Sequence, residues 1–289
     1  MEDVYKNTPE ALVANVIHLI SLPGVYTQLE KTLKEPNHTR NDIAEIISID
    51  PALSARILRI INSSYYGLPN PVQSIAIAVN LLGEYDLRNM VLVTSVVNSV
   101  AVLTDRGIDI HSFWQHSIRC AIAAKLLASL KTYEDPEFLF LSGLLHDLGR
   151  LIIYKNEREL SETVSSYVTR EGRERYQVEQ ELLGFDHAFV GFLLAQSWCL
   201  PAKLGDIIKC HHQPELSTDN QLESKLVSLA DLLAHYLEKN VIKTIIDLDE
   251  WPKIKAYLEE LDITPEILTD LLNDVLEKSQ SIEEIICET

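Results

Sequence analysis

The chain has 289 residues, a length that fits one large helical domain or two smaller ones. Hydrophobic residues make up 46%, and only 10 Gly and 11 Pro occur, which excludes collagen-like, linker-dominated and disordered classes. The net charge of −18 repels phosphate backbones and anionic lipids, so we expect neither nucleic acid nor a membrane as partner. The N-terminus has no basic region followed by an apolar stretch, and no uninterrupted apolar run reaches the length of a membrane span, so we expect a cytoplasmic protein.

Helical periodicity dominates the first part of the chain. Thr8-Pro9-Glu10 combines a capping residue, a first-turn proline and an acid, and apolar residues then follow at helical spacing as far as Ile20. Leu22-Pro23-Gly24 is expected to end this helix. Further helices are expected from about residue 41, then over residues 51–61, 72–82 and 84–103. The valine-rich stretch 91–102 could be taken for a strand, but an isolated strand in a helical chain would have nothing to pair with.

The second part is also expected to be helical, over residues 113–130, 136–154, 186–196, 201–211 and 223–238. The stretch 104–109 is mostly polar and contains Gly107, which suggests a boundary there. We therefore predict two all-α subdomains, residues 1–107 and 108–239, and an acidic helical extension over 240–289. The extension carries four Lys and thirteen Asp or Glu, and we interpret it as a solvated helical surface rather than a docking tail.

The four cysteines, Cys120, Cys199, Cys210 and Cys287, form no C-x-x-C pair. Each lies in an apolar or helical context, so we expect reduced, buried thiols and neither a thiolate nucleophile nor a Cys-based zinc site. The chain also contains no P-loop, no G-x-G-x-x-G after a strand and no G-x-S-x-G elbow. No organic cofactor is therefore expected.

The histidines divide into two groups. Four of them, His18, His38, His111 and His235, are interpreted as ordinary surface or core residues. The others recur with two aspartates on successive predicted helices, at separations of 30, 40, 24 and 19 residues: His116, His146-Asp147, His187, His211-His212 and Asp231. Imidazole and carboxylate ligands of this kind suit iron, manganese, zinc or nickel, and ligands from several helices can converge in the core of a bundle.

The surroundings of the two aspartates strengthen this interpretation. Asp147 lies in a nearly apolar helix, and Asp231 lies within Leu226–Leu233, so both carboxylates are expected to be buried and to converge. A buried ionised carboxylate needs a partner or a metal. The alternative is a hydrogen-bonded His-Asp network that orders the core without metal. For the set as a whole we favour one or two transition-metal ions.

Several motifs resemble known families. The pattern His116, His146-Asp147 and Asp231 resembles the metal signature of the HD superfamily, and the additional His187 and His211-His212 resemble the ligand set of HD-GYP phosphodiesterases. Over about residues 8–235 the chain resembles the HDOD family in these stretches: Leu22–Gly24, Ile46–Leu58, Asn62–Gly67, Val72–Ile75 and Gly143–Gly149. This resemblance implies a bacterial signal-transduction output module with an HD-type helical bundle.

The chain departs from HD-GYP enzymes at two places. Arg150 stands where those enzymes carry Lys, and His211-His212 continues into Gln213-Pro214-Glu215 without a Gly-Tyr-Pro loop. Arg and Lys are not interchangeable where a compact ammonium must contact a phosphate. Substrate binding of the HD-GYP kind is therefore not expected to be retained, even if metal binding is.

Two functions remain open at this point. The first is a signalling module that binds a protein partner and is a metal-occupied pseudo-enzyme. In this case the Asp50-Pro51 and Asn62-Ser63 motifs are expected to be structural. The second is a metal-dependent phosphohydrolase, in which Arg150 would contact phosphate and the resemblance implies a cyclic dinucleotide as substrate.

Overall fold

The structure is a computed structural model that describes residues 7–20, 22–103, 108–240 and 246–287. Within these residues it contains helices and no strand, as predicted. The predicted boundary at residue 107 falls outside the described residues. The helices before it are α1 (Pro9–Val16), α2 (Gly24–Leu33), α3 (Arg40–Ser48), α4 (Pro51–Ile61), α5 (Ile75–Leu82), α6 (Glu84–Val100) and the short 3-10 helix η1 (Ala101–Leu103).

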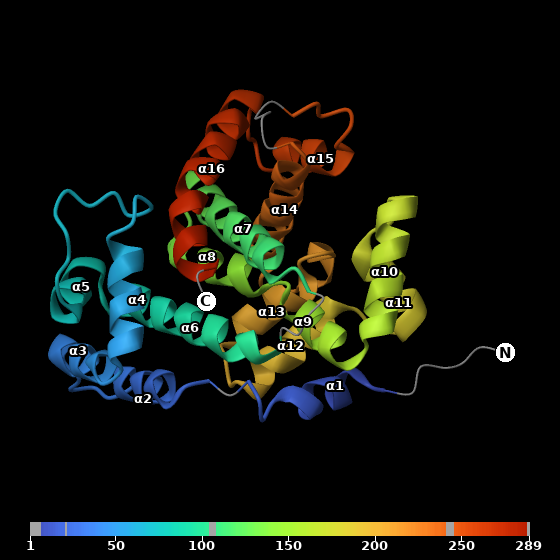
Figure 1. Cartoon of the computed structure of the whole chain (residues 1–289). Helices are drawn as coiled ribbons and strands as arrows, with labels where there is room; N and C mark the ends of the chain where they lie inside the picture. Colours follow the sequence, from blue (N-terminus) through green and yellow to red (C-terminus); the bar gives the residue numbers. More distant parts are fainter. Residues whose placement is uncertain (1–6, 21, 104–107, 241–245, 288–289) are drawn as a thin grey trace.

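The helices that follow include those that carry the candidate site (Figure 1). They are α7 (Ile110–Leu130), α8 (Pro136–Leu145), α9 (Leu148–Asn156), α10 (Arg158–Glu171), α11 (Arg175–Leu183), α12 (His187–Ser197), α13 (Ala202–Cys210), the 3-10 helix η2 (Pro214–Leu216), α14 (Gln221–Lys239), α15 (Pro252–Glu260) and α16 (Pro265–Cys287).

Side-chain caps explain several helix starts in the first half. Thr8 accepts a hydrogen bond from the Ala11 backbone N–H, and Asp50 accepts from the first-turn N–H groups of α4. Asn62 bridges the turn before α5, because its amide both donates to the Val72 carbonyl and accepts from the Val72 N–H, at 2.9 and 2.7 Å. These contacts support the structural interpretation of the Asp50-Pro51 and Asn62-Ser63 motifs.

The valine-rich stretch is helical, and it forms most of α6. Among the described residues, Glu84–Leu103 is the one stretch long and apolar enough to cross a membrane, with a mean hydropathy of 1.3. However, 67% of it is buried inside the protein, and α6 packs against α2, α4, α5 and α8. This burial is typical of a core helix.

The first and last helices both pack away from their neighbours in sequence (Figure 1). Helix α1 lies against α9 and α12, where Asn156 donates a hydrogen bond to the Leu12 carbonyl and Trp198 donates one to the Ile20 carbonyl. Helix α16 runs along α7 and also contacts α4. The two ends of the chain therefore both cover the second half.

Three expectations are corrected by the structure. Helix α2 starts at Gly24, where we expected only the end of the preceding helix. Residues 136–154 form two helices rather than one, because the chain breaks at His146-Asp147. Cys199 is exposed, with a positive φ of 54°, whereas Cys120 and Cys210 are buried as expected. The side chain of Cys287 lies outside the described part of the structure.

Candidate metal centre

The site is built around the junction between α8 and α9. His146 closes α8, and Asp147 has φ −101° and ψ 4° before α9 resumes the helical path. Both side chains are buried, with 0% and 3% exposure. The break places two consecutive side chains in the same interior space, which an unbroken helix would not do because neighbours in a helix point about 100° apart.

A glycine allows a third helix, α12, to reach this junction. A Cβ added to Gly149 would lie 2.0 Å from the His187 carbonyl oxygen and 2.8 Å from the Gly191 nitrogen. Only a residue without a side chain permits so close an approach of the two backbones. Helix α12 can therefore deliver His187, its first residue, to Asp147.

The structure brings together all seven side chains that we predicted as ligands. His116 comes from α7, His187 from α12, His211 and His212 from the end of α13, and Asp231 from α14. Ligand atoms of the following sets lie within 4.8 Å of one another: His187, His211 and His212; His116, His146 and Asp147; His146, His211 and Asp231; and His116, Asp231 and His235. These clusters could bind metal ions.

One half of the cluster contains the HD motif residues. His116 Nε2 lies 3.1 Å from Asp231 Oδ1, 3.4 Å from His146 Nε2 and 3.8 Å from Asp147 Oδ2. His146 Nε2 lies 3.6 Å from an oxygen of each aspartate. The two carboxylates therefore converge on the same two imidazoles, as the sequence predicted.

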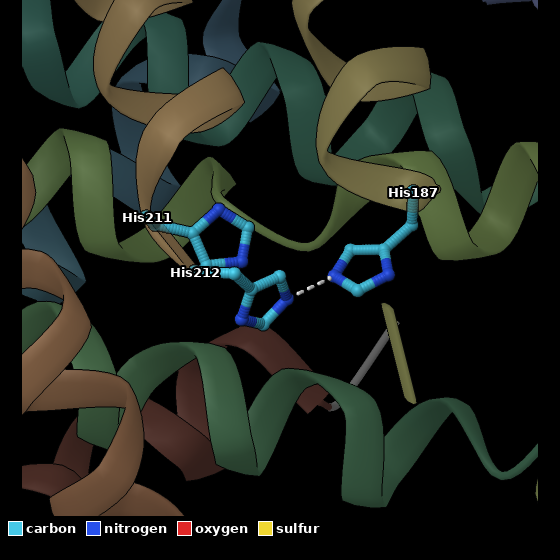
Figure 2. Close-up of side chains that lie close together, drawn as sticks. All are labelled: His187, His211 and His212. Carbon is cyan, nitrogen blue, oxygen red and sulfur yellow. Dashed lines mark hydrogen bonds between the residues drawn. The ribbon is translucent and has the colours of Figure 1, made fainter. Parts of the chain in front are cut away.

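The other half contains His187, His211 and His212, which lie close together in Figure 2, where a dashed line joins His212 to His187. His187 Nε2 lies 2.8 Å from His212 Nε2 and 3.0 Å from Asp147 Oδ1. Asp147 thus turns one oxygen to each half of the cluster. A bridging carboxylate of this kind suits a centre of two metal ions.

Backbone carbonyls fix the orientation of two imidazoles. The Nδ1–H of His146 donates to the Gly143 carbonyl at 2.6 Å, and the Nδ1–H of His211 donates to the Ile208 carbonyl at the same distance. A carbonyl oxygen only accepts, so each Nδ1 must carry a hydrogen, and the Nε2 atom of each ring is the one that lies among the other ligand atoms.

Carboxylates orient two further imidazoles. His187 Nδ1 contacts Glu179 Oε2 at 2.6 Å, and His116 Nδ1 contacts Glu238 Oε1 at 2.8 Å. A carboxylate behind the far nitrogen of a histidine is a recurrent feature of metal ligands, since it orients the ring and raises its basicity. Neither glutamate was predicted from the sequence.

The observation that best fits a metal ligand is at His211. Its Nε2 is buried and has no hydrogen-bond partner among the described residues. Burial, together with His146 and His187, lowers the pKa of His211 to about 3, so the ring is neutral at pH 7. A buried, unpaired nitrogen lone pair is costly in a core but is what a metal ion requires.

Carboxylates favour the protonated form of the two histidines that they contact, His116 and His187. Burial would lower the pKa of His116, but its contacts with Asp231 and Glu238 outweigh this and raise it to about 10. Burial is likewise outweighed at His187, whose pKa Glu179 and Asp147 raise to about 10. Binding of a metal ion would release these protons.

His235 also belongs to the site. It lies one helical turn after Asp231, with Nε2 3.4 Å from Asp231 Oδ1, and its ring is 4.4 Å from the ring of His116. Its side chain is 43% exposed, so it lies at the outer edge of the cluster. The interpretation of His235 as an ordinary histidine needs to be revised.

Arg150 contacts Asp147 directly, and two cavities open beside this pair. Burial would raise the pKa of Asp147, but Arg150 and the neighbouring histidines hold it well below its usual range. The cavities measure about 500 and 680 Å³, and both are lined by Arg150, Arg175, His235 and Glu238. Small molecules therefore have access to the cluster.

A model of the HDOD domain matches residues 19–214, which is more than half of the chain. The chain belongs to the HDOD domain family. The match includes six of the seven predicted ligands. It ends before α14, the helix that carries the seventh, Asp231.

Solved structures share the HDOD fold. A candidate phosphohydrolase from Shewanella amazonensis SB2B is 28% identical, with a TM-score of 0.78 over 95% of this chain and 97% of that one. An HDOD domain protein with unknown function from Geobacter sulfurreducens is 25% identical, with a TM-score of 0.74, and the match covers 96% of this chain and 98% of that protein. A candidate signal transduction protein from Marinobacter aquaeolei VT8 is 20% identical, with a TM-score of 0.72, and the match covers 95% of this chain and 61% of that protein. This likeness shows the fold alone. The chain spans 42% of the length of a curated relative, an uncharacterized protein of Treponema pallidum (strain Nichols), to which it is 24% identical over 221 residues.

Proposed function

We propose that this HDOD chain is a signal-transduction output module that binds a protein partner and contains a metal centre without hydrolytic activity. The observation that carries the proposal is the contact between Arg150 and Asp147. Arg150 is the residue that would have to hold a substrate phosphate, and it is instead paired with Asp147, one of the proposed metal ligands. The metal then stabilises the native state, because it binds only the folded arrangement of ligands.

The ligand arrangement supports metal binding by the seven predicted residues. Two halves share Asp147, four imidazoles have their Nδ1 atoms fixed, and the buried His211 Nε2 has no partner in the part of the chain that the structure describes. Iron, manganese, zinc or nickel suit such nitrogen and oxygen ligands. When bound, the ions would polarise a phosphoester and activate water, if a substrate could be held in place.

Substrate positioning is what the chain is missing. The segment after His212 turns directly into the short 3-10 helix η2 and then α14, so no loop of the Gly-Tyr-Pro kind is present there. Catalysis needs the phosphate aligned with the attacking water, and this alignment can account for many orders of magnitude in rate. We therefore expect metal affinity to be retained and turnover to be lost.

A metal-dependent phosphohydrolase is the second candidate. The cavities beside the cluster favour it, and so does the name of the Shewanella relative. The deciding experiment combines elemental analysis with turnover of cyclic di-GMP by protein loaded with manganese or iron, and an Asp147→Ala variant is the control. Retained metal without turnover supports the signalling module. Turnover that disappears in the variant would establish the hydrolase instead.

A further inference from the structure

The smaller of the two cavities has a distinctive lining. It lies between α7, α9, α10, α11 and α14, and we call it the arginine lobe because three of its walls carry Arg119, Arg150 and Arg175. These side chains are 8%, 29% and 21% exposed. The same lining includes two carboxylates, Asp109 and Glu238, so the guanidinium groups outnumber the carboxylates by one. The three guanidinium groups offer N–H donors to an anion in the cavity.

The described contacts do not fully compensate these charges. Arg175 donates to the Ser165 hydroxyl at 3.0 Å, and its carboxylate neighbour, Glu179, is 3.7 Å away and already bonded to His187. Burial and the nearby Arg150 lower the pKa of Arg175 to about 10. Two buried cations beside each other repel, and an anion between them would relieve this repulsion.

A second observation also indicates an oxygen-rich ligand. Tyr154 lines the same lobe, and its hydroxyl is buried and makes no hydrogen bond to the described residues. Buried polar groups without partners are rare in proteins, because each costs desolvation energy. A ligand with several acceptor oxygens would satisfy this hydroxyl and the guanidinium groups together.

The lobe is connected to the last helix through a single carboxylate. Glu283 of α16 accepts hydrogen bonds from Arg119 Nε at 3.3 Å and from the Gln115 amide at 3.0 Å. Beside it, Ile282 and Ile286 line a small cavity with Tyr65 and Phe140, on the side of the first half of the chain. Glu283 therefore already holds one N–H donor of Arg119, and an incoming anion would compete with it for that guanidinium.

We propose that the arginine lobe binds a small molecule through a phosphate group, and that this phosphate displaces Glu283 from Arg119 and loosens the end of α16. Arg119 and Arg175 contact the phosphate, since guanidinium forks match phosphate oxygens. Release of α16 then changes the contact between the two halves of the chain. Only this output step rests on the proposed signalling function, because the phosphate site itself does not require the metal.

The first test is calorimetric titration with inorganic phosphate and pyrophosphate at constant ionic strength. Arg175→Gln should weaken binding about tenfold or more, because it removes a charged hydrogen-bond donor. Glu283→Gln should tighten binding about threefold, because it removes the internal competitor. Arg173→Gln is the matched control, since Arg173 lines only the larger cavity and pairs with Glu181. Equal affinity in all four proteins, or weaker binding by Glu283→Gln, overturns the proposal.

The second test separates the lobe from the metal centre. The same titration is repeated after chelator treatment, and melting curves confirm that each variant is folded. Binding that persists without metal and is lost in Arg175→Gln supports the site, whatever the metal centre does. Binding that disappears with the metal and is unaffected by Arg175→Gln places the phosphate on the metal and refutes the lobe. Hydrogen exchange within α16 should rise on addition of pyrophosphate, and unchanged exchange refutes the displacement of Glu283.

Discussion

Replacement of His211 by leucine should have opposite consequences in the metal-free and metal-loaded protein. Without metal, the wild type keeps a buried His211 Nε2 with no partner among the described residues, at a cost of about 1–3 kcal/mol, and the change removes this cost. The change also removes the Nδ1–H bond to Ile208, worth about 1 kcal/mol. The metal-free variant should therefore be as stable as the wild type, or more stable by up to about 2 kcal/mol.

With metal, the same change removes a ligand. An ion present at one hundred times its Kd stabilises the wild type by about 2.7 kcal/mol. Loss of an outer partner of a ligand costs 10- to 100-fold in affinity, so loss of a ligand should cost at least about 100-fold. The stabilisation by metal would then fall to about 0.4 kcal/mol. With an unfolding entropy of about 2.1 cal/mol/K for each of the 289 residues, the shift in Tm falls from about 4 °C to below 1 °C.

Differential scanning calorimetry with and without manganese, iron or zinc measures both effects. His111→Leu provides the control, since His111 is an exposed histidine near the start of α7. A variant that loses several kcal/mol without metal, yet retains the full metal-dependent shift in Tm, would show that His211 orders the core and binds no ion. That result would refute the reasoning.

Three further changes test other parts of the structure. Glu179→Gln should weaken metal binding about 10- to 100-fold in a chelator competition assay, whereas the exposed Glu181→Gln should not. Gly149→Ala should destabilise the protein by about 1–3 kcal/mol or more in urea unfolding, because its Cβ has no room, whereas Gly24→Ala, with nothing within 4 Å, should be neutral. Asp86→Asn should stabilise by about 1 kcal/mol at pH 8 and have no effect near pH 4. Burial and a neighbouring carboxylate on α8 raise the pKa of Asp86 from 3.8 to about 6, so the stability due to its protonated form is present below pH 3.8 and is lost as the pH rises through 6. A constant effect across this pH range would contradict the assignment.

The all-α class and the convergence of the seven side chains could be predicted from sequence because both depend on local patterns. Helical periodicity identified most helices. An aspartate in an apolar helix, as at Asp147 and Asp231, needs a partner once it is buried, whatever the tertiary fold. The break at His146-Asp147 could not be predicted, because the apolar pattern continues through it. Just after the break, at Gly149, the backbone of α12 comes close to α9, a tertiary contact that periodicity does not reveal.

Outer residues of the site were missed for a different reason. Glu179 lies on α11, a helix that the sequence analysis did not predict, and only the fold brings it to His187. His235 and Glu238 could have been found, since they follow Asp231 at i+4 and i+7 and therefore share its helix face. Spacing relative to an established candidate is thus more informative than the composition around each histidine alone.

The position of α1 has a consequence for the synthesis of the chain on the ribosome. Its docking surface includes Trp198, which is 178 residues beyond Ile20 in the sequence. At about 5–20 residues per second, the partner surface emerges roughly 10 to 35 s after α1 itself. During that interval Leu12, Val13 and Val16 have no native surface to cover them. Helix α1 is therefore expected to dock late relative to its synthesis, and it is a natural target for chaperones that bind nascent apolar segments.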